Sequence, residues 1–114
     1  MKRKRIIKKF LNREIKIVYV NDYVVLETVN FLLRKAGFNV ALETLNLLKT
    51  HKRIKIINVN SKIFEDACKI FKEHPGLSLT DASIAATMQH LEIRQLYSFD
   101  SGFDKIKWIE KLTD

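Results

Sequence analysis

The carboxylate of Asp81 stands where an apolar side chain would be expected. In the stretch Leu77–Leu91, "LSLTDASIAATMQHL", apolar residues recur at helical spacing, and one turn before Ile84 the apolar stripe reaches Asp81. Burying an uncompensated charge costs several kcal/mol. An acid in the first turn of a helix, with Ser78 or Thr80 as the cap, is instead stabilised by the helix dipole by about 0.3–1 kcal/mol. Taken alone, Asp81 is consistent with either a helix start or a ligand.

Three further acids share this ambiguity. Glu27 interrupts the helical pattern "YVVLETVNFLLRK", residues 23–35, which is apolar on nearly every side and is therefore predicted to be buried. Asp100 follows the strand pattern "QLYSF", residues 95–99, and ligands of open α/β sheets bind at the carboxyl ends of strands. Alone, Asp100 is more typical of an Asx turn before Gly102 than of a ligand, and Asp104, four residues later, is similar.

Considered as a set, these acids indicate a cation. Carboxylates that meet in space repel one another unless a divalent ion lies between them, and Mg²⁺ and Mn²⁺ are the hard ions that prefer carboxylate oxygen and water. Such sites activate water and stabilise the leaving oxygen in phosphodiester cleavage. The chain has no Cys/His pattern with zinc spacing. The sequence therefore predicts a Mg²⁺ or Mn²⁺ site that draws its ligands from Glu27, Asp81, Asp100 and Asp104.

The segments that carry these acids alternate between the apolar spacing of strands and that of helices. This alternation is typical of an α/β fold with a largely parallel sheet. Strands are predicted over residues 14–20, 53–59 and 95–99. Helices are predicted over residues 3–12, from Asp22 as cap to Lys35 before Gly37, over Val40–Thr50, from Asn60 or Ser61 to about Phe71, and after Thr80.

Length and composition favour one small domain, residues 1–114. The chain of 114 residues, 46% of them apolar, is long enough for one core and too short for two ordinary domains. It contains no apolar run long enough for a membrane span, and no secretory signal. Its one cysteine, Cys68, lies in an apolar-periodic segment, so we expect a reduced, packed thiol in a cytoplasmic protein.

Positive charge is concentrated at the N-terminal end. Residues 1–20 hold eight basic side chains and one acid, whereas the whole chain has a net charge of +8. The cluster Lys2, Arg3, Lys4 and Arg5 could bind RNA through phosphate contacts that carry no sequence information. The alternative is a solvated face of an amphipathic helix.

Three segments together resemble the PIN domain family, in particular the toxin ribonucleases of VapC type. They are "DYVVLETVNFLLRKAG", "LTDA" and "LYSFDSGFD", and the resemblance extends over about residues 3–112. It implies a three-layer α/β fold and a Mg²⁺- or Mn²⁺-dependent endoribonuclease. In this resemblance Glu27, Asp81 and Asp100 match the catalytic, metal-binding acids, Asp104 is an adjacent candidate, and Thr80 and Ser98 are flanking polar residues.

The same resemblance implies partners, and the sequence departs from the family pattern in one respect. VapC-type toxins commonly form homodimers and pair with an antitoxin protein. PIN domains begin with an apolar strand that ends in an Asp, and no residue here matches that acid, because "MKRKRIIKKF" aligns with the helix that follows it. We therefore expect an N-terminally incomplete PIN-like domain, either truncated or completed by self-association, with impaired cleavage. The alternative is a catalytically inactive module of the same fold that binds RNA or a protein.

Overall fold

The elements of the chain alternate between strands and helices in a computed structural model, which describes residues 16–97 and 101–112. In order they are β1 (Val18–Asn21), α2 (Asp22–Ala36), α3 (Phe38–Thr50), β2 (Ile54–Ile57), α4 (Ser61–Glu73), α5 (Leu79–Leu91), β3 (Gln95–Tyr97), the 3-10 helix η1 (Ser101–Lys105) and β4 (Glu110–Leu112). The predicted order is confirmed between residues 16 and 97, with boundaries shifted by a few residues. The predicted helix over residues 3–12 lies outside the described residues.

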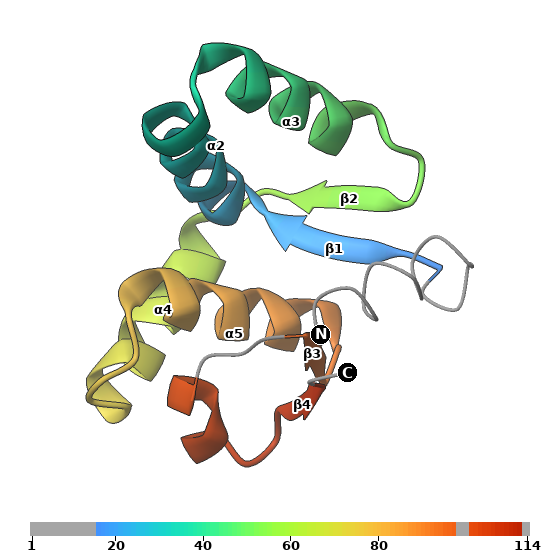
Figure 1. The fold of residues 1–114 in the computed structure, drawn as a ribbon. Helices are drawn as coiled ribbons and strands as arrows, with labels where there is room; N and C mark the ends of the chain where they lie inside the picture. Colours follow the sequence, from blue (N-terminus) through green and yellow to red (C-terminus); the bar gives the residue numbers. More distant parts are fainter. Residues whose placement is uncertain (1–15, 98–100, 113–114) are drawn as a thin grey trace.

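The strands form two parallel pairs. β1 pairs with β2, with Val18 opposite Ile54, and β3 pairs with β4, with Gln95 opposite Glu110. Figure 1 shows α2 and α3 on one side of the β1–β2 pair and α4 and α5 on the other. The predicted α/β class with parallel strands between helical layers is therefore confirmed.

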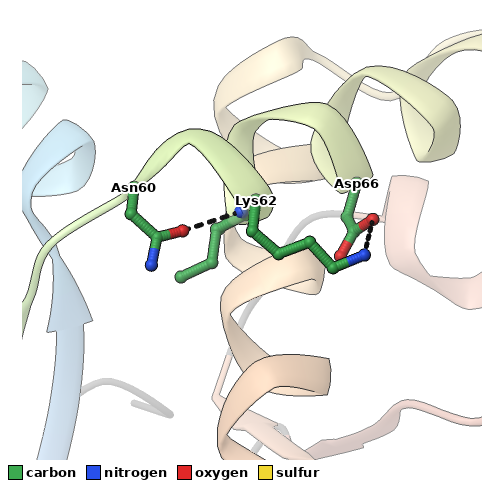
Figure 2. Close-up of polar contacts among 4 residues, drawn as sticks. Asn60, Lys62 and Asp66 are labelled. Carbon is green, nitrogen blue, oxygen red and sulfur yellow. Dashed lines mark hydrogen bonds and ion pairs between the residues drawn. The ribbon is translucent and has the colours of Figure 1, made fainter.

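Side-chain caps set the starts of three helices. Asn60 Oδ1 accepts a hydrogen bond from Ile63 N at 2.9 Å at the start of α4, where Lys62 and Asp66 also form an i,i+4 ion pair (Figure 2). Ser78 Oγ accepts from Asp81 N at 3.0 Å at the start of α5. Both caps agree with the sequence prediction.

The cap predicted at Asp22 is wrong, because the residue before it takes that role. Asn21 Oδ1 accepts from Val24 N at 2.9 Å, so Asn21 caps α2. Asp22 is the first helical residue, and its carboxylate instead accepts hydrogen bonds from Asn58 Nδ2 and Val59 N, at 2.7 and 3.0 Å. Asp22 thus joins the start of α2 to the segment that follows β2.

The core lies between α4, α5 and the segment around η1. Small side chains on α5, among them Ala82, Ala85 and Ala86, are almost completely buried and allow α4 to approach closely. Phe103, at 2% exposure, packs into the same cluster from η1. This packing gives α5 a fixed position, which matters because α5 carries Asp81.

The prediction that the helix around Glu27 is buried is wrong. Within α2 only Val25 is buried, and Leu26 is 61% exposed. The described part of the chain places α3, β1 and the start of α5 against α2, which leaves much of its surface without a neighbour. Both α2 and α3 expose apolar side chains. Even so, no helix in residues 16–97 or 101–112 is long and apolar enough to cross a membrane.

Candidate functional site

The carboxylate of Glu27 lies beside the first turn of α5. Thr80 Oγ1 donates a hydrogen bond to Glu27 Oε2 at 2.5 Å, a contact between residues 53 positions apart in the chain. Glu27 is exposed rather than buried, so water screens its charge. The contact brings two of the predicted site residues, Glu27 and Thr80, together.

Asp81 follows Thr80 directly and is half-buried. Its backbone N–H is bonded to the Ser78 cap, and it stands in the first turn of α5, where the positive end of the helix dipole stabilises an acid. The interpretation of Asp81 as part of a helix start is therefore confirmed, and its role as a ligand stays a prediction. It belongs to a capped helix start, and it is adjacent to the residue that binds the second carboxylate.

A buried polar network holds α5 against the end of β1. Asn21 is only 3% exposed, and its Nδ2 donates to Ser83 Oγ at 3.1 Å and to Thr87 Oγ1 at 3.2 Å. Ser83 Oγ in turn donates to the Thr80 carbonyl at 2.6 Å. Because Asn21 also caps α2, one side chain links the helix that carries Glu27 to the helix that carries Asp81.

Sequence reasoning missed Asn21. The signal was present as the pair "ND" at a strand end, but Asn and Asp are about equally good caps. Only the contacts to Ser83 and Thr87, more than 60 residues away, distinguish the two candidates.

Of the other predicted acids, the structure describes Asp104 alone. Asp104 on η1 forms an ion pair with Lys111 of β4 at 2.6 Å, and its side chain is exposed. Asp100 and Ser98 lie outside the described residues, as do Lys2, Arg3, Lys4 and Arg5. The described geometry thus brings Glu27, Thr80 and Asp81 together and holds Asp104 in a different contact.

The chemistry of these donors suits a hard divalent ion only in part. Carboxylate and hydroxyl oxygens are the ligand types that Mg²⁺ and Mn²⁺ prefer. However, the residues that the structure describes contain no group of three or more His, Cys, Asp or Glu side chains that could hold a metal ion. Glu27 and Asp81 are therefore candidates for part of a ligand set, and that set would need a further donor.

Comparison with known proteins agrees with this architecture. The family model "PIN domain" matches residues 2–109. Among solved structures, VapC20 of Mycobacterium tuberculosis, a toxin that cleaves the sarcin-ricin loop, superposes with a TM-score of 0.74 and 24% sequence identity, covering 83% of this chain and 74% of that one. No curated protein sequence matches. The structural similarity concerns the fold.

Proposed function

The chain belongs to the PIN domain family, and we propose that it is a PIN-type endoribonuclease that cleaves RNA with the help of Mg²⁺ or Mn²⁺. One observation carries the proposal. Two acids that are far apart in sequence, Glu27 and Asp81, are brought to the same helix start through Thr80. The structural similarity of the chain to VapC20, a toxin that cleaves the sarcin-ricin loop, supports RNA as the substrate class.

In this proposal each residue has a defined role. Glu27 and Asp81 supply carboxylate oxygens, and Asp100 is the predicted third acid. Thr80 orients the Glu27 carboxylate through its hydroxyl, and Asn21 fixes α5 relative to α2. A bound divalent ion would supply the positive charge that activates water and stabilises the phosphodiester oxygens. Because no residue of this sequence matches the first acid of PIN domains, we expect weak metal binding and weak cleavage.

Substitution of Asp81 tests this proposal. Asp81→Asn keeps the side-chain size and the Ser78 cap but removes one negative charge, so we expect loss of any Mn²⁺-dependent RNA cleavage in a chain that stays folded. Cleavage of a labelled structured RNA and calorimetric titration with Mn²⁺ measure the two effects separately. Circular dichroism reports the fold.

The matched control is Asp66→Asn, which removes a carboxylate from the exposed ion pair with Lys62 on α4. Exposed pairs of this kind contribute about 0.3–0.5 kcal/mol, so the fold and the cleavage should both persist. Cleavage by Asp81→Asn at the wild-type rate, or cleavage that continues in excess EDTA, would contradict the proposal.

A second candidate function is a non-catalytic module that binds RNA. The concentration of basic residues at the N-terminal end favours it. It predicts no carboxylate-dependent heat on Mn²⁺ titration. It also predicts that replacing Lys2, Arg3, Lys4 and Arg5 by Ser abolishes RNA binding, and that RNA binding by the wild-type chain weakens steeply with salt, since each phosphate contact contributes to that slope.

Partners and cellular location follow from the same proposal. Residues 1–114 would form one PIN-like domain in the cytoplasm, associated as a homodimer and paired with an antitoxin protein. The apolar side chains exposed on α2 and α3 support association of some kind, because solvent-exposed apolar surface favours contact with another protein.

A further inference from the structure

The connection between α3 and β2 concentrates positive charge. Residues 44–64 contain five basic side chains and no acid, whereas the rest of residues 16–97 and 101–112 contains nine basic and ten acidic side chains. One of the five, Lys62 on α4, is paired with Asp66. The other four, which we call the basic turn, are Lys49, Lys52, Arg53 and Lys55. The described part of the chain therefore owes its net positive charge to this one region.

Hydrogen bonds fix the main chain of the basic turn. The N–H of His51 donates to the Leu47 carbonyl at 2.9 Å, and the N–H of Ile54 donates to the His51 carbonyl at 3.1 Å. The N–H of Arg53 donates to His51 Nδ1 at 3.1 Å, and the Arg53 carbonyl accepts from Val18 N at 2.8 Å. The turn is thus bonded to α3 on one side and to β1 on the other. Binding a ligand there would require the ordering of side chains rather than of main chain.

Local structure accounts for one of these cations and not for the others. Lys49 lies in the last turn of α3, where the negative end of the helix dipole favours a cation. Lys52 and Lys55 are exposed, and neither forms an ion pair within the part of the chain that the structure describes. Cations that are close together repel one another, and a polyanion with regularly spaced charges relieves that repulsion.

The basic turn lies at the opposite end of the β1–β2 pair from Glu27 and Asp81. β2 begins at Ile54, directly after the turn, whereas β1 ends at Asn21, where α2 begins. Because the two strands are parallel, the turn and Asn21 are at opposite ends of a pair that spans about 13 Å (Figure 1). The basic turn is therefore separate from the proposed metal site.

We propose that the basic turn binds phosphate groups of RNA and forms a contact region outside the acidic site. Lysine and arginine side chains bind phosphate oxygens of any sequence, so these contacts contribute affinity and position rather than base recognition. The choice of RNA as the polyanion rests on the proposed function, whereas the location of the site rests on the charge and exposure of the turn.

RNA binding by the full chain in EDTA tests the proposal, because EDTA prevents metal-dependent cleavage. The probe is a fluorescein-labelled single-stranded oligouridylate, followed by fluorescence anisotropy. Lys52→Gln together with Lys55→Gln removes two charges and keeps the length of both side chains. We expect about tenfold weaker binding than wild type. We also expect a slope of log affinity against log salt that is shallower by about 1.4, since each phosphate contact with a single strand contributes about 0.7.

Two matched variants control for net charge and for folding. Lys69→Gln together with Lys72→Gln removes the same charge from exposed positions on α4, and we expect its binding to stay within about twofold of wild type. Lys52→Arg together with Lys55→Arg keeps the charge of the turn and should bind like wild type. Equal weakening by the two glutamine pairs, or wild-type binding by Lys52→Gln with Lys55→Gln, would overturn the proposal.

Competition identifies the class of polyanion. Unlabelled oligouridylate should displace the probe at a concentration about tenfold lower than polyglutamate of the same total charge, since phosphates bind guanidinium and ammonium groups closely. Equal displacement by both polymers would overturn the assignment to RNA and indicate an acidic protein surface.

The same assay distinguishes this inference from the nuclease proposal. Asp81→Asn should bind the probe in EDTA like wild type, because Asp81 lies outside the basic turn. A wild-type chain that cleaves no RNA with Mn²⁺ would contradict the nuclease proposal, and the comparison of the glutamine pairs in EDTA would still decide whether the basic turn binds RNA.

Discussion

At the scale of single residues, the side chain of Asn21 joins α2 to α5 through three hydrogen bonds. It caps α2, is buried, and donates to two hydroxyls of α5. A buried amide that lost these partners would leave polar groups unsatisfied, which costs more than the loss of an exposed hydrogen bond. The relation between Glu27 and Asp81 therefore depends on a residue that has no part in the proposed chemistry.

Substituting Asn21 measures this role. Asn21→Ala removes the cap and both donated hydrogen bonds, so we expect it to lower the free energy of unfolding by about 2–3 kcal/mol in urea titrations. Asn60→Ala removes an exposed cap of the same type from α4, and we expect a loss of about 1 kcal/mol. Equal losses in the two variants would show that the buried donations of Asn21 contribute nothing.

At the scale of elements, the angle between α2 and α3 depends on one glycine. Gly37 joins the two helices with φ +94° and ψ 174°, a backbone conformation that is open almost only to glycine. A Cβ added there would meet no atom within 4 Å, so only backbone strain opposes a larger residue. The sharp turn allows the two helices to pack on each other.

The strain at Gly37 gives a testable expectation. Gly37→Ala should lower the free energy of unfolding by about 1–3 kcal/mol, although the added methyl group has free space. Ala36→Gly, at the exposed last residue of α2, is the control for a change of residue size at the same junction, and it should cost no more than about 1 kcal/mol. A neutral Gly37→Ala variant in thermal and urea unfolding would mean that the junction relaxes.

At the scale of the whole molecule, the apolar surface is distributed unevenly. The core gathers around α4, α5 and η1. Of the thirteen exposed large apolar side chains among residues 16–97 and 101–112, seven lie on α2 and α3. These seven are Leu26, Phe31, Leu33, Phe38, Val40, Leu42 and Leu47. Exposed apolar surface promotes association, so we retain the expectation of a homodimer as a prediction.

Placing a positive charge on this apolar surface tests the prediction. Phe38→Lys on α3 places a cation at a side chain that is 65% exposed, so we expect the dimer dissociation constant to rise at least about tenfold in sedimentation equilibrium, while the fold is kept. Phe71→Lys, an exposed phenylalanine on α4, should leave association unchanged. A wild-type chain that is monomeric at micromolar concentration would contradict the prediction.

Local sequence patterns were sufficient for the class of the fold and for the order of its elements. Helix and strand periodicity, caps such as Ser78 and Asn60, and the stop at Gly37 act over a few residues, so they can be read without knowing what packs against them. The same patterns identified Asp81 as a candidate because it stands at a helix start, and Glu27 because it interrupts an apolar helical pattern. Thr80 was identified as a site residue through the resemblance to PIN domains.

Tertiary structure decided what the local patterns could not. The exposure of α2, the contact of Thr80 with Glu27 and the pairing of Asp104 with Lys111 each depend on a partner that local sequence does not reveal. Asn21 and Asp22 are equivalent as caps in sequence, and only the hydroxyls of α5 determine which of them turns inward. The physical reason is that burial and hydrogen-bond partners are properties of neighbours in space, which chain position alone does not specify.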